Sequence, residues 1–582
     1  MPNIIESRYE TKRERYTRLR SQLGIERATF EPDWRECNDW ILSRRARFFN
    51  SDVNRGGRRN QRIIDSTGTL AVRTLRSGMM AGITSPSRDW KRLTTDDPEL
   101  AEFGRVKRWL SIYNDRMTSV FLRSNLYNVL PLTYGDMGVF GTSGIFVEED
   151  FDKVIRFYSL PIGSYWIAND ERLRVSVMMR EFKMTVRQVV MKFGKYDWQT
   201  GLARWDNISD FVKTCWDRGD YEIWVDISHV IHMNNEYDKN KISSKKFVSC
   251  YYEIGNSSKG AANYISKGHD DDIYLRESGY DYFPGLFPRW EVTGEDVYAT
   301  SCPGFDALGD IKQLQHGEKK SAKALDKQVD PAMVGPTSLR NQKATILPGD
   351  MTYVDERDGQ KGFRPAHEVN LQVDKLEMKQ QQVRLRIQRA FYEDLFLMLA
   401  QSDRREITAR EIDERHEEKL LALGPVLEQT NQDLLDPLID ITSDFMFRQG
   451  LVPPPPPELE GMSLKVEYIS IMAQAQKLAG IAGLERFVNV VGNLTKLTGQ
   501  MPRKFNVDQF IDVYGDRLSV DPSIIRDDEE VAEMEAREQK AQQAMMMAEQ
   551  MKNMSGAARD LSQADLEKDS ALKRMVDQSA AI

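Results

Sequence analysis

Cysteine is scarce in this sequence, and long apolar runs are missing. Only four of the 582 residues are cysteines, and Cys37, Cys215, Cys250 and Cys302 are far apart, without a CxxC pair. This pattern excludes a disulfide framework and a zinc knuckle, and it is typical of a reduced cytoplasmic compartment. The N-terminal segment MPNIIESRYETKRERY has no apolar signal-peptide core, and no apolar run approaches the length of a membrane span. The sequence therefore predicts a protein that is made and used in a cytoplasm.

Catalytic motifs are also missing. The chain has no G-x-x-x-x-G-K-[ST] phosphate loop, no HExxH and no GxSxG motif. His229 and His232 lie on a strand-like run, and their spacing points them to opposite faces, which is poor for ligation of one metal ion. The acids at 270–272 fall on a predicted loop and are more typical of solvated surface than of a cation site. We expect no active site, no metal site and no cofactor.

Length, composition and charge predict a large soluble protein. At 582 residues, with 40% hydrophobic and 29% charged residues, the chain is long enough for about two to four structural units. Its net charge of −8 argues against a protein that coats nucleic acid with a uniformly basic surface.

The N-terminal region is rich in basic residues. Residues 3–24 are predicted to form a charged helix with one apolar stripe, made of Tyr9, Tyr16, Leu19 and Leu23. A second basic segment, 43–62, carries Arg44, Arg45, Arg47, Arg55, Arg58, Arg59 and Arg62. Such a segment is either a flexible arm that meets an acidic partner or a solvated helix face and loop.

Residues 68–93 predict a helix, a turn and an anchoring aromatic residue. The apolar positions of this helix are Leu70, Val72, Leu75, Met79 and Met80. Gly82 can take the left-handed conformation that ends a helix, and Pro86 prevents continuation. Trp90 then follows beside two basic residues.

The middle of the chain changes from helical to strand-like patterns. Residues 99–147 begin with a helical pattern and end in the short apolar run Ser143–Val147. Between 151 and 300, β-branched and aromatic runs recur, namely VIRFYSL, YWIAND, RVSVMM, YEIWVDISHVIHM and KFVSCYYEI. Residues 257–281 predict an exposed loop or hairpin followed by a short strand. The fold class is therefore α+β.

Two long helices are predicted after residue 303. They span 304–329 and 368–400, and a Gly- and Pro-rich segment with short β-like runs separates them. At ~1.5 Å per residue the second helix would be about 45–50 Å long. Two such helices side by side form a stalk with a compact β-rich insertion at its end.

The C-terminal third is mostly helical. A polar loop at 400–409 precedes a helix that Thr408 and Glu411 can cap, and this helix runs to about 449 with a kink at Gly424-Pro425. The run PPPPP at 453–457 predicts a stiff spacer. It is more typical of a rigid turn without a partner than of a segment that an SH3-like domain would bind.

Further helix is expected from 468 to 520. The tail, 526–578, has high helix propensity but a thin apolar stripe of Val531, Met534, Met545, Met546 and Met551. It is either one strand of a helical barrel made with other copies or a solvated tail.

Basic side chains on the two stalk helices and the following loop are the candidates for contact with DNA. They are Lys319, Lys320, Lys323, Lys327, Lys375, Lys379, Arg384, Arg386, Arg389, Arg404 and Arg405. In a ring of subunits, one lysine per chain becomes a circle of positive charge that faces the phosphates. The alternative is that these residues are ordinary charged faces of amphipathic helices.

Four segments carry a resemblance to a known family. They are NRGGRRNQRIIDSTG (54–68), SGMMAGITSPSRDWKRL (77–93), GEDVYATSCPGFDALGDIKQLQ (294–315) and REITAREIDERHEEKLLALGPVLEQTNQDLLDPLI (405–439). Together they resemble the head-to-tail connector (portal) proteins of short-tailed, podovirus-type DNA bacteriophages over about residues 1–450. The third segment reads YATSCP at 298–303, where many relatives have Tyr-Gly-Arg-Ser-Pro.

The resemblance implies an α+β portal-type subunit with named parts. A mixed α/β wing would occupy 1–290, with stem helices at 291–330 and 367–399 flanking a β-rich clip at 331–366. A channel loop would follow at 400–409, and a long kinked wing helix with the Pro-rich linker at 410–470. A helical crown at 471–525 and a C-terminal tail or barrel at 526–582 would complete the subunit.

The resemblance also implies a role and partners. The chain would form a non-enzymatic dodecameric ring at one capsid vertex of the virion, assembled in the cytoplasm of the bacterial host. Double-stranded DNA would pass through the ring during packaging and ejection, without sequence-specific contacts. The ring would dock the terminase motor and later tail adaptor and nozzle proteins, beside major capsid and scaffolding proteins, and would bind no membrane.

Two other classes remain as alternatives. A terminase-type ATPase or nuclease is disfavoured by the missing phosphate loop. A tail adaptor or scaffolding protein is the second alternative. Scaffolds are usually shorter and overwhelmingly helical, which the β-rich region at 151–300 contradicts.

Overall fold

The computed structural model describes most of the chain in separate stretches. They are residues 11–48, 61–97, 100, 103–196, 203–204, 207–238, 241, 244–255, 273–329, 333–334, 364–365, 373–402, 423–459, 461, 464–470, 481–498, 505–507, 509–510, 514, 531, 534, 536–548 and 550–551. The chain forms two compact units. Unit 1 comprises Met1–Thr94, Ser111–Pro454 and Lys465–Ala479, and unit 2 comprises Thr95–Leu110, Pro455–Leu464 and Gly480–Ile582.

Two antiparallel sheets form the centre of unit 1. The larger sheet has the order β10-β9-β8-β5-β4, with bounds Arg276–Tyr280, Phe247–Glu253, Trp224–Met233, Val175–Thr185 and Tyr165–Asn169. The smaller sheet has the order β11-β2-β3, with bounds Gly285–Leu286, Gly144–Asp150 and Val154–Leu160. All five strand-like runs expected between 151 and 300 are confirmed, as is the short strand expected at the end of 257–281, which is β10.

Helices cover both faces of the larger sheet, which explains why its strands are nearly continuous apolar runs. On one face, helix α1 (Lys12–Trp40) packs Leu19 and Leu23 against Val230 of β8. On the other face, α6 (Val186–Phe193) and α7 (Asp210–Arg218) pack against Ile227 and Tyr251. The sequence analysis did not identify α6 or α7. Two-residue strands β6 (Lys195–Tyr196) and β7 (Ala203–Arg204) lie between them in the chain.

Helix α1 is confirmed at its N-terminal half and is longer than expected. Thr11 and Glu14 form the capping box that begins it. The expected end near residue 24 is wrong, because the helix continues to Trp40. The helix continues past Pro32, and the residues beyond this proline include Trp34 and Cys37, which are both fully buried. Tyr9 lies outside the described residues.

Helix α2 (Thr67–Ile83) confirms the helix predicted from 68, with two differences. Val72, Leu75 and Met79 are buried as expected, whereas Leu70 is half exposed. Gly82 does not end the helix in a left-handed conformation, because the buried Ile83 extends the packed face by one residue.

The following elements agree with the sequence pattern. Trp90 is buried and stacks on Phe121, with ring centroids 5.9 Å apart. The helical pattern between 99 and 147 resolves into α4 (Gly104–Arg123) and α5 (Leu126–Phe140), followed by β2.

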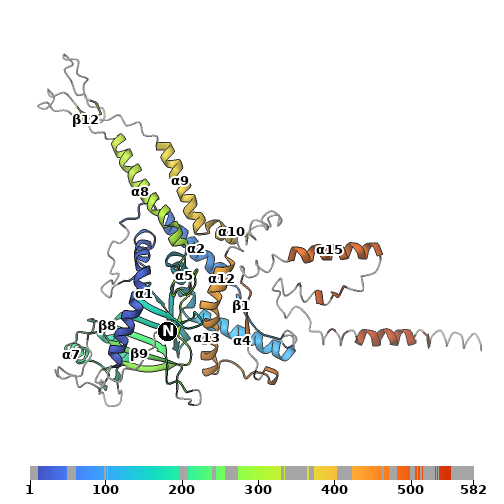
Figure 1. The fold of residues 1–582 in the computed structure, drawn as a ribbon. Coiled ribbons are helices and arrows are strands. Elements are labelled where there is room, and N and C mark those ends of the chain that lie inside the picture. Colours follow the sequence, from blue (N-terminus) through green and yellow to red (C-terminus); the bar gives the residue numbers. More distant parts are fainter. Residues whose placement is uncertain are drawn as a thin grey trace, which may run out of the picture. The chain divides into compact units, whose positions relative to one another are not determined.

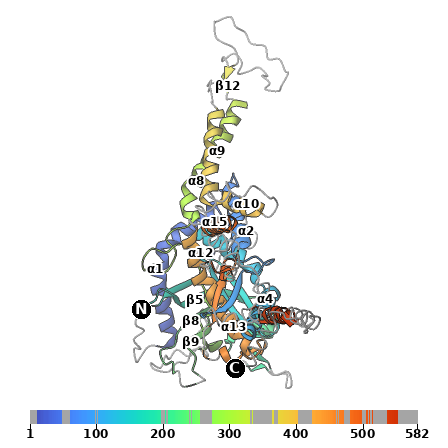
Figure 2. The same ribbon diagram turned by 90° about the vertical axis from the view of Figure 1, so that its right-hand side faces the viewer.

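Helices α8 (Pro303–Val329) and α9 (Val373–Ala390) run side by side away from the sheets (Figures 1 and 2). Strands β12 (Met333–Val334) and β13 (Arg364–Pro365) pair antiparallel at the far end of the pair. The prediction that two helices lie side by side as a stalk is therefore confirmed for the described residues, whereas the compact β-rich insertion, of which only β12 and β13 are described, stays a prediction.

The single helix expected over 368–400 is wrong. It breaks after Ala390, and α10 (Glu393–Ser402) begins in a new direction. Tyr392 adopts a left-handed backbone with φ of 55°, which no helix interior accommodates. The described part of α9 has 18 residues and is about 27 Å long instead of 45–50 Å. Thr408 and Glu411 lie outside the described residues.

A continuous helical run follows from Gly424. It consists of α12 (Gly424–Thr430), a π-helical segment η2 (Asn431–Leu435) and α13 (Asp436–Arg448). The expected end near 449 is confirmed, and Pro425 occupies the first turn of α12. The segment before residue 423 lies outside the described residues, so the predicted kink stays a prediction.

A 3₁₀ turn begins at the last residue of the proline run, and a strand follows it. These are η3 (Pro457–Leu459) and β14 (Leu464–Tyr468), and β14 pairs with β1 (Lys91–Thr95). The expectation that helix begins at 468 is wrong, because Tyr468 ends this strand and the next peptide N–H, of Ile469, donates to the carbonyl of Trp90 at 3.0 Å.

Unit 2 taken by itself contains α15 (Ile481–Thr498) and a helical stretch within 536–551. A row of aromatic rings, Phe487, Phe505, Phe510 and Tyr514, has successive centroid distances of 6.0, 5.4 and 5.4 Å. These helices agree with the helix expected over 468–520 and in the tail.

Candidate nucleic-acid interface

The stalk is rooted in the buried core of unit 1. The backbone N–H of Ala299 donates to Thr142 Oγ1 at 2.8 Å. Gly304, in the first turn of α8, packs against the backbone of Val139, and a Cβ there would lie 2.3 Å from that carbonyl oxygen. The segment 298–303, which departs from the connector pattern, is thus tightly packed and leads directly into α8.

A buried ion pair fastens the base of the stalk to the helical run after Gly424. Arg289 donates from Nε and Nη2 to the two carboxylate oxygens of Asp433, at 2.9 and 3.0 Å. Both side chains are almost fully buried. Asp433 lies in the π-helical segment η2, where the altered helix register aims its carboxylate at Arg289. A bidentate pair of this kind fixes orientation as well as distance.

Polar contacts also hold α8 and α9 together. Arg384 of α9 donates to Glu318 of α8 at 2.6 Å and to Asp65 at 3.0 Å. Partial burial acts to raise the pKa of the Asp65 carboxyl, but hydrogen bonds from Thr67 and the Arg384 guanidinium outweigh it and hold that pKa below its ordinary value. Nearer the start of α8, Arg386 of α9 donates to Asp310 of α8 at 2.7 Å. Arg384 and Arg386 therefore join helices to each other.

The lysines of α8 lie on a different side of that helix. Lys319, Lys323 and Lys327 follow one another at intervals of four residues and are exposed. They are well separated around the helix from Glu318 and Ser321, which contact α9. Lys320 is also exposed beside this stripe.

The candidates predicted from sequence thus fall into three groups. Seven are exposed and make no ion pair with any residue that the structure describes: Lys319, Lys320, Lys323, Lys327, Lys375, Lys379 and Arg389. Two, Arg384 and Arg386, are held in ion pairs between the stalk helices. The remaining two, Arg404 and Arg405, lie outside the described residues. The stalk therefore has an exposed stripe of lysines on α8, and it also has arginine–carboxylate ion pairs where α8 and α9 meet.

Sequence analysis missed a second feature of the stalk, its exposed apolar side chains. Leu325 and Val329 of α8 are 53% and 77% exposed, and Met378 and Leu385 of α9 are 68% and 46% exposed. On α9, Met378 and Leu385 lie on a different side of the helix from Val383 and Ile387, which are buried. The sequence did contain a hint of this feature, because Met378 and Leu385 are seven residues apart and so lie on one side of a helix. The charged residues around them made the pattern hard to recognise.

The basic segment 43–62 is engaged within the chain where it is described. Arg45 forms a buried ion pair with Asp136, with an Nη2–Oδ2 distance of 2.6 Å. Arg62 pairs with Asp39 at 2.8 Å. Arg55, Arg58 and Arg59 lie outside the described residues. Arg45 is therefore structural and Arg62 is paired within the chain, which does not support an arm that meets an acidic partner at these two positions.

The two strand histidines point to opposite faces, as their spacing predicts. His229 is fully buried, accepts from Arg180 Nε at its Nδ1 (3.1 Å), and stacks on Tyr251 with ring centroids 3.6 Å apart. His232 lies 3.4 Å from the hydroxyl of Tyr16 on the α1 side. In the described part of the chain, no three His, Cys, Asp or Glu side chains are grouped so as to hold a metal ion. None of the helices described there has both the length and the apolar character needed to span a bilayer.

Comparison with known proteins identifies the family. Residues 13–525 match the family described as bacteriophage head to tail connecting protein. The chain belongs to the phage head-to-tail connector family. The resemblance inferred from four sequence segments is therefore confirmed, and the match extends beyond the region of about 1–450 that those segments covered.

Two relatives support the same assignment. The connector is 45% identical over 545 residues to the portal protein of Salmonella phage epsilon15, covering 93% of this chain and 94% of that protein. It is 40% identical over 553 residues to the probable portal protein of Bordetella phage BPP-1, covering 95% of each. The function supported by these findings is that of a podophage portal, or head-tail connector.

Proposed function

We propose that the chain is one of twelve subunits in a closed ring at one capsid vertex, and that double-stranded DNA passes through the bore of this ring. The observation that carries the proposal is the stalk formed by α8 and α9, with a stripe of exposed lysines on α8 and separate exposed apolar side chains. A slender helix pair with these surfaces is well suited to a ring in which neighbouring stalks pack side by side. In the terms of the family, α8 and α9 are the stem.

The apolar side chains support contact between neighbouring stems. Exposed apolar strips on soluble proteins commonly mark interaction surfaces. Val329 and Met378 are the most exposed large hydrophobic residues of the described stem. In a ring, the stem of an adjacent subunit would cover Met378 and leave the lysines of α8 for the bore.

The lysines support passage of DNA without firm binding. Repeated in each subunit, Lys319 or Lys323 becomes a circle of positive charge. Phosphate contacts of exposed lysines are weak and screened by salt, so the duplex is centred but not held. An exposed acidic residue on the same helix, Asp326, keeps the attraction shallow. Contacts with phosphates carry no direct sequence information, so passage is independent of sequence.

The proposed roles of the remaining parts follow from membership of the connector family. The clip, 331–366, docks the terminase motor during packaging and the tail adaptor and nozzle proteins afterwards. The wing, 1–290 with 410–470, and the crown, 471–525, lie beside the capsid and scaffolding proteins. The channel loop, 400–409, narrows the bore. The assembled protein is part of the virion and acts without catalysis.

Imaging of the purified full-length protein tests the proposal. Class-averaged electron micrographs at micromolar protein concentration are expected to contain closed rings with a central hole and twelvefold symmetry. The same preparation is expected to lack DNA-stimulated ATP hydrolysis. Monodisperse monomers would contradict the ring, and an ATPase rate abolished by a point mutation would favour a terminase subunit instead.

A further inference from the structure

Two consecutive residues, Arg289 and Trp290, are anchored in the core of unit 1. They are buried, with exposed fractions of 3% and 4%. The backbone N–H of Trp290 donates to the carbonyl of Gly141 at 2.8 Å, and Arg289 forms an isolated β-bridge with Thr142. These contacts tie the dipeptide to the segment that follows α5, so both side chains extend from a fixed base.

The ring of Trp290 reaches the break between α9 and α10. Its centroid lies 6.3 Å from that of Tyr392, and the two ring planes are inclined at 34°. Aromatic rings attract each other at this separation. Tyr392 is the residue with φ of 55° at which the helix changes direction. The contact is therefore made where α9 ends and α10 begins.

The side chain of Arg289 reaches a second irregularity, the π-helical segment η2. Its bidentate ion pair with Asp433 is supported by Gln429, which donates to the same carboxylate at 2.8 Å. In η2 the N–H of Asp436 donates to the carbonyl of Asn431, five residues earlier instead of four. A turn of this kind holds one residue more than an α-helical turn.

The extra residue lets both halves of the helical run pack on unit 1. Before η2 the buried positions include Val426, Leu427 and Thr430, and after it they are the pairs 434–435, 438–439, 441–442 and 445–446. With ~3.6 residues per turn, continuation from Val426 and Leu427 places these pairs about one residue earlier. Packing thus explains why a π-helical turn is present, but it does not explain the buried ion pair at this turn.

The two contacts flank one stretch of the chain. Tyr392 directly precedes α10, and Asp433 lies just after α12. The proposed channel loop, 400–409, lies between them in the sequence. Neighbouring residues of one dipeptide therefore hold the chain on both sides of this stretch. Fixing both ends of a segment reduces the number of conformations that it can adopt.

Backbone strain is concentrated at the same place. Among the residues that the structure describes, three non-glycine residues have a left-handed backbone: Val154, Leu173 and Tyr392. Two of the three contact the dipeptide, because Arg289 Nη2 donates to the carbonyl of Leu173 at 3.1 Å and Trp290 lies against Tyr392. Such conformations persist where surrounding contacts hold them, and they are common at functional sites.

We propose that Arg289 and Trp290 form a clamp that positions the chain between Tyr392 and Asp433, and with it the loop at the bore. The inference rests on the proposed function, which assigns 400–409 to the channel. In this role the two side chains are positioning residues, since they act through the stretch whose ends they hold and not by contact with DNA. Loss of either contact frees one end of the stretch, and loss of both frees the two ends together.

Hydrogen exchange of full-length rings tests the clamp one end at a time. Asp433→Asn is expected to raise amide exchange in α12 at least about tenfold, because Arg289 loses hydrogen bonds to a charged group. Trp290→Leu is expected to raise exchange in α10 at least about threefold, because an aromatic pair is lost. Trp290→Phe should exchange more slowly than Trp290→Leu at the same amides, since a ring remains against Tyr392. An even rise over all of unit 1 would overturn the proposal and show a purely structural role.

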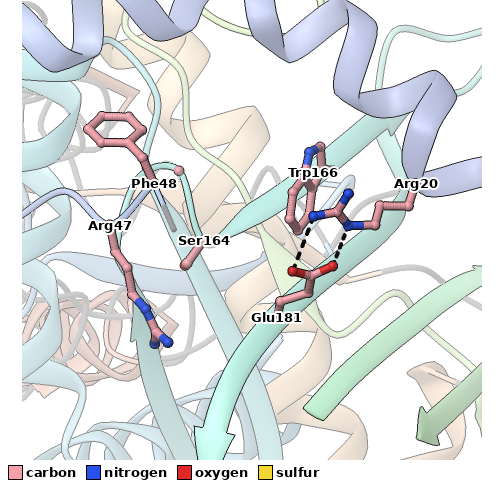
Figure 3. Close-up of a pocket in the computed structure, with 7 residues that line it drawn as sticks. Arg20, Arg47, Phe48, Ser164, Trp166 and Glu181 are labelled. Carbon is pink, nitrogen blue, oxygen red and sulfur yellow. Dashed lines mark hydrogen bonds and ion pairs between the residues drawn. The ribbon is translucent and has the colours of Figure 1, made fainter. Parts of the chain in front are cut away.

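Two other arginine–carboxylate pairs of unit 1 provide matched controls for Asp433→Asn. Arg45 pairs with the buried Asp136, and Arg20 pairs with Glu181 beside Trp166 (Figure 3). Asp136→Asn and Glu181→Gln also leave a guanidinium without its carboxylate, which is costly when the group is buried. Both are expected to keep wild-type exchange in α12. Accelerated exchange in α12 in both controls would contradict the clamp, because any lost ion pair would then have the same effect.

Assembled particles separate the clamp from the ring. The double variant Asp433→Asn, Trp290→Leu is expected to form closed rings in micrographs, and particles that contain these rings are expected to lose packaged DNA relative to the wild type. Wild-type packaging and retention by particles of this variant would overturn the role of the clamp in the channel. Failure of the unmodified protein to form rings would contradict the proposed function itself, whereas uniform exchange in intact rings contradicts the clamp alone.

Discussion

At the scale of single residues, one glycine allows two helices to meet below the stem. Gly78 of α2 faces Phe396 of α10, and a Cβ at residue 78 would lie 2.1 Å from that ring. Phe396 is buried and has no room to move away. We expect Gly78→Ala to lower the free energy of unfolding by about 1–3 kcal/mol, as overpacking does elsewhere. Thermal unfolding of the purified variant measures this change.

A second glycine provides the control for that substitution. Gly309 lies inside α8, and nothing lies within 4 Å of a Cβ built there. Gly309→Ala is expected to stabilise the fold by up to about 1 kcal/mol, because alanine loses less backbone entropy in a helix. Equal destabilisation by both substitutions would show that helix packing at Gly78 is not the cause.

The buried histidine of β8 predicts a dependence of stability on pH. Burial, and then the nearby Arg180, hold the pKa of His229 well below its ordinary value of 6.5. As the pH falls below about 6.5, the unfolded chain takes up a proton at this position before the folded chain does. Stability from this residue is therefore present above pH 6.5 and is lost below it, by up to about 1.4 kcal/mol per pH unit. The pKa of His232 is also lowered by burial, so it acts in the same direction.

Denaturant unfolding between pH 7.5 and pH 5 measures this effect. His229→Gln is expected to reduce the slope of unfolding free energy against pH, whatever its stability at pH 7.5. His316→Gln, at an exposed position of α8, is expected to keep the wild-type slope. An unchanged slope in His229→Gln would contradict the role of this side chain.

At the scale of elements, the basic residues of the stem are of two kinds: arginines that join the two helices and lysines that are exposed. Arg384→Met leaves the carboxylates of Asp65 and Glu318 without their shared partner and is expected to destabilise the fold by about 1–2 kcal/mol, allowing for partial exposure of the pair. Lys319→Met combined with Lys323→Met is expected to change stability by less than about 0.5 kcal/mol. Thermal unfolding distinguishes the two cases.

The two lysines are expected to act on DNA instead. Their neutralisation should alter packaging or genome retention in assembled particles while ring formation stays intact. Loss of ring formation in the lysine variant would mean that these side chains are structural, as Arg384 is.

Much of the element structure could be predicted from the sequence. The strands of the larger sheet, α2, α8 and α13 follow from apolar periodicity and composition. The break at Tyr392 could not be predicted, because nothing in EVNLQVDKLEMKQQQVRLRIQRAFYEDLFLMLA resembles a helix stop. There the packing of α10 on Gly78, and of Tyr392 beside Trp290 at a centroid distance of 6.3 Å, overrides local helix propensity.

At the scale of the whole molecule, the C-terminal tail is expected to be dispensable for the ring. The family match ends at residue 525, and the described tail methionines are mostly exposed, with Met545 at 75% and Met551 at 74%. A chain ending at residue 525 should therefore form rings and unfold at the same temperature as the full chain. Native mass measurement and calorimetry check this expectation. A lower unfolding temperature of truncated rings would favour a C-terminal barrel.

The sequence by itself determined the family, the fold class and most of the elements, because these depend on local patterns and on segments shared with other connectors. It also placed cations on the stalk. Only the tertiary structure decided which of them are solvated, because the partners of Arg384 lie 66 and 319 positions away in the chain. It likewise decided that Tyr392 and Asp433 both meet the dipeptide of Arg289 and Trp290, since no local pattern of residues specifies contacts between distant parts of the chain.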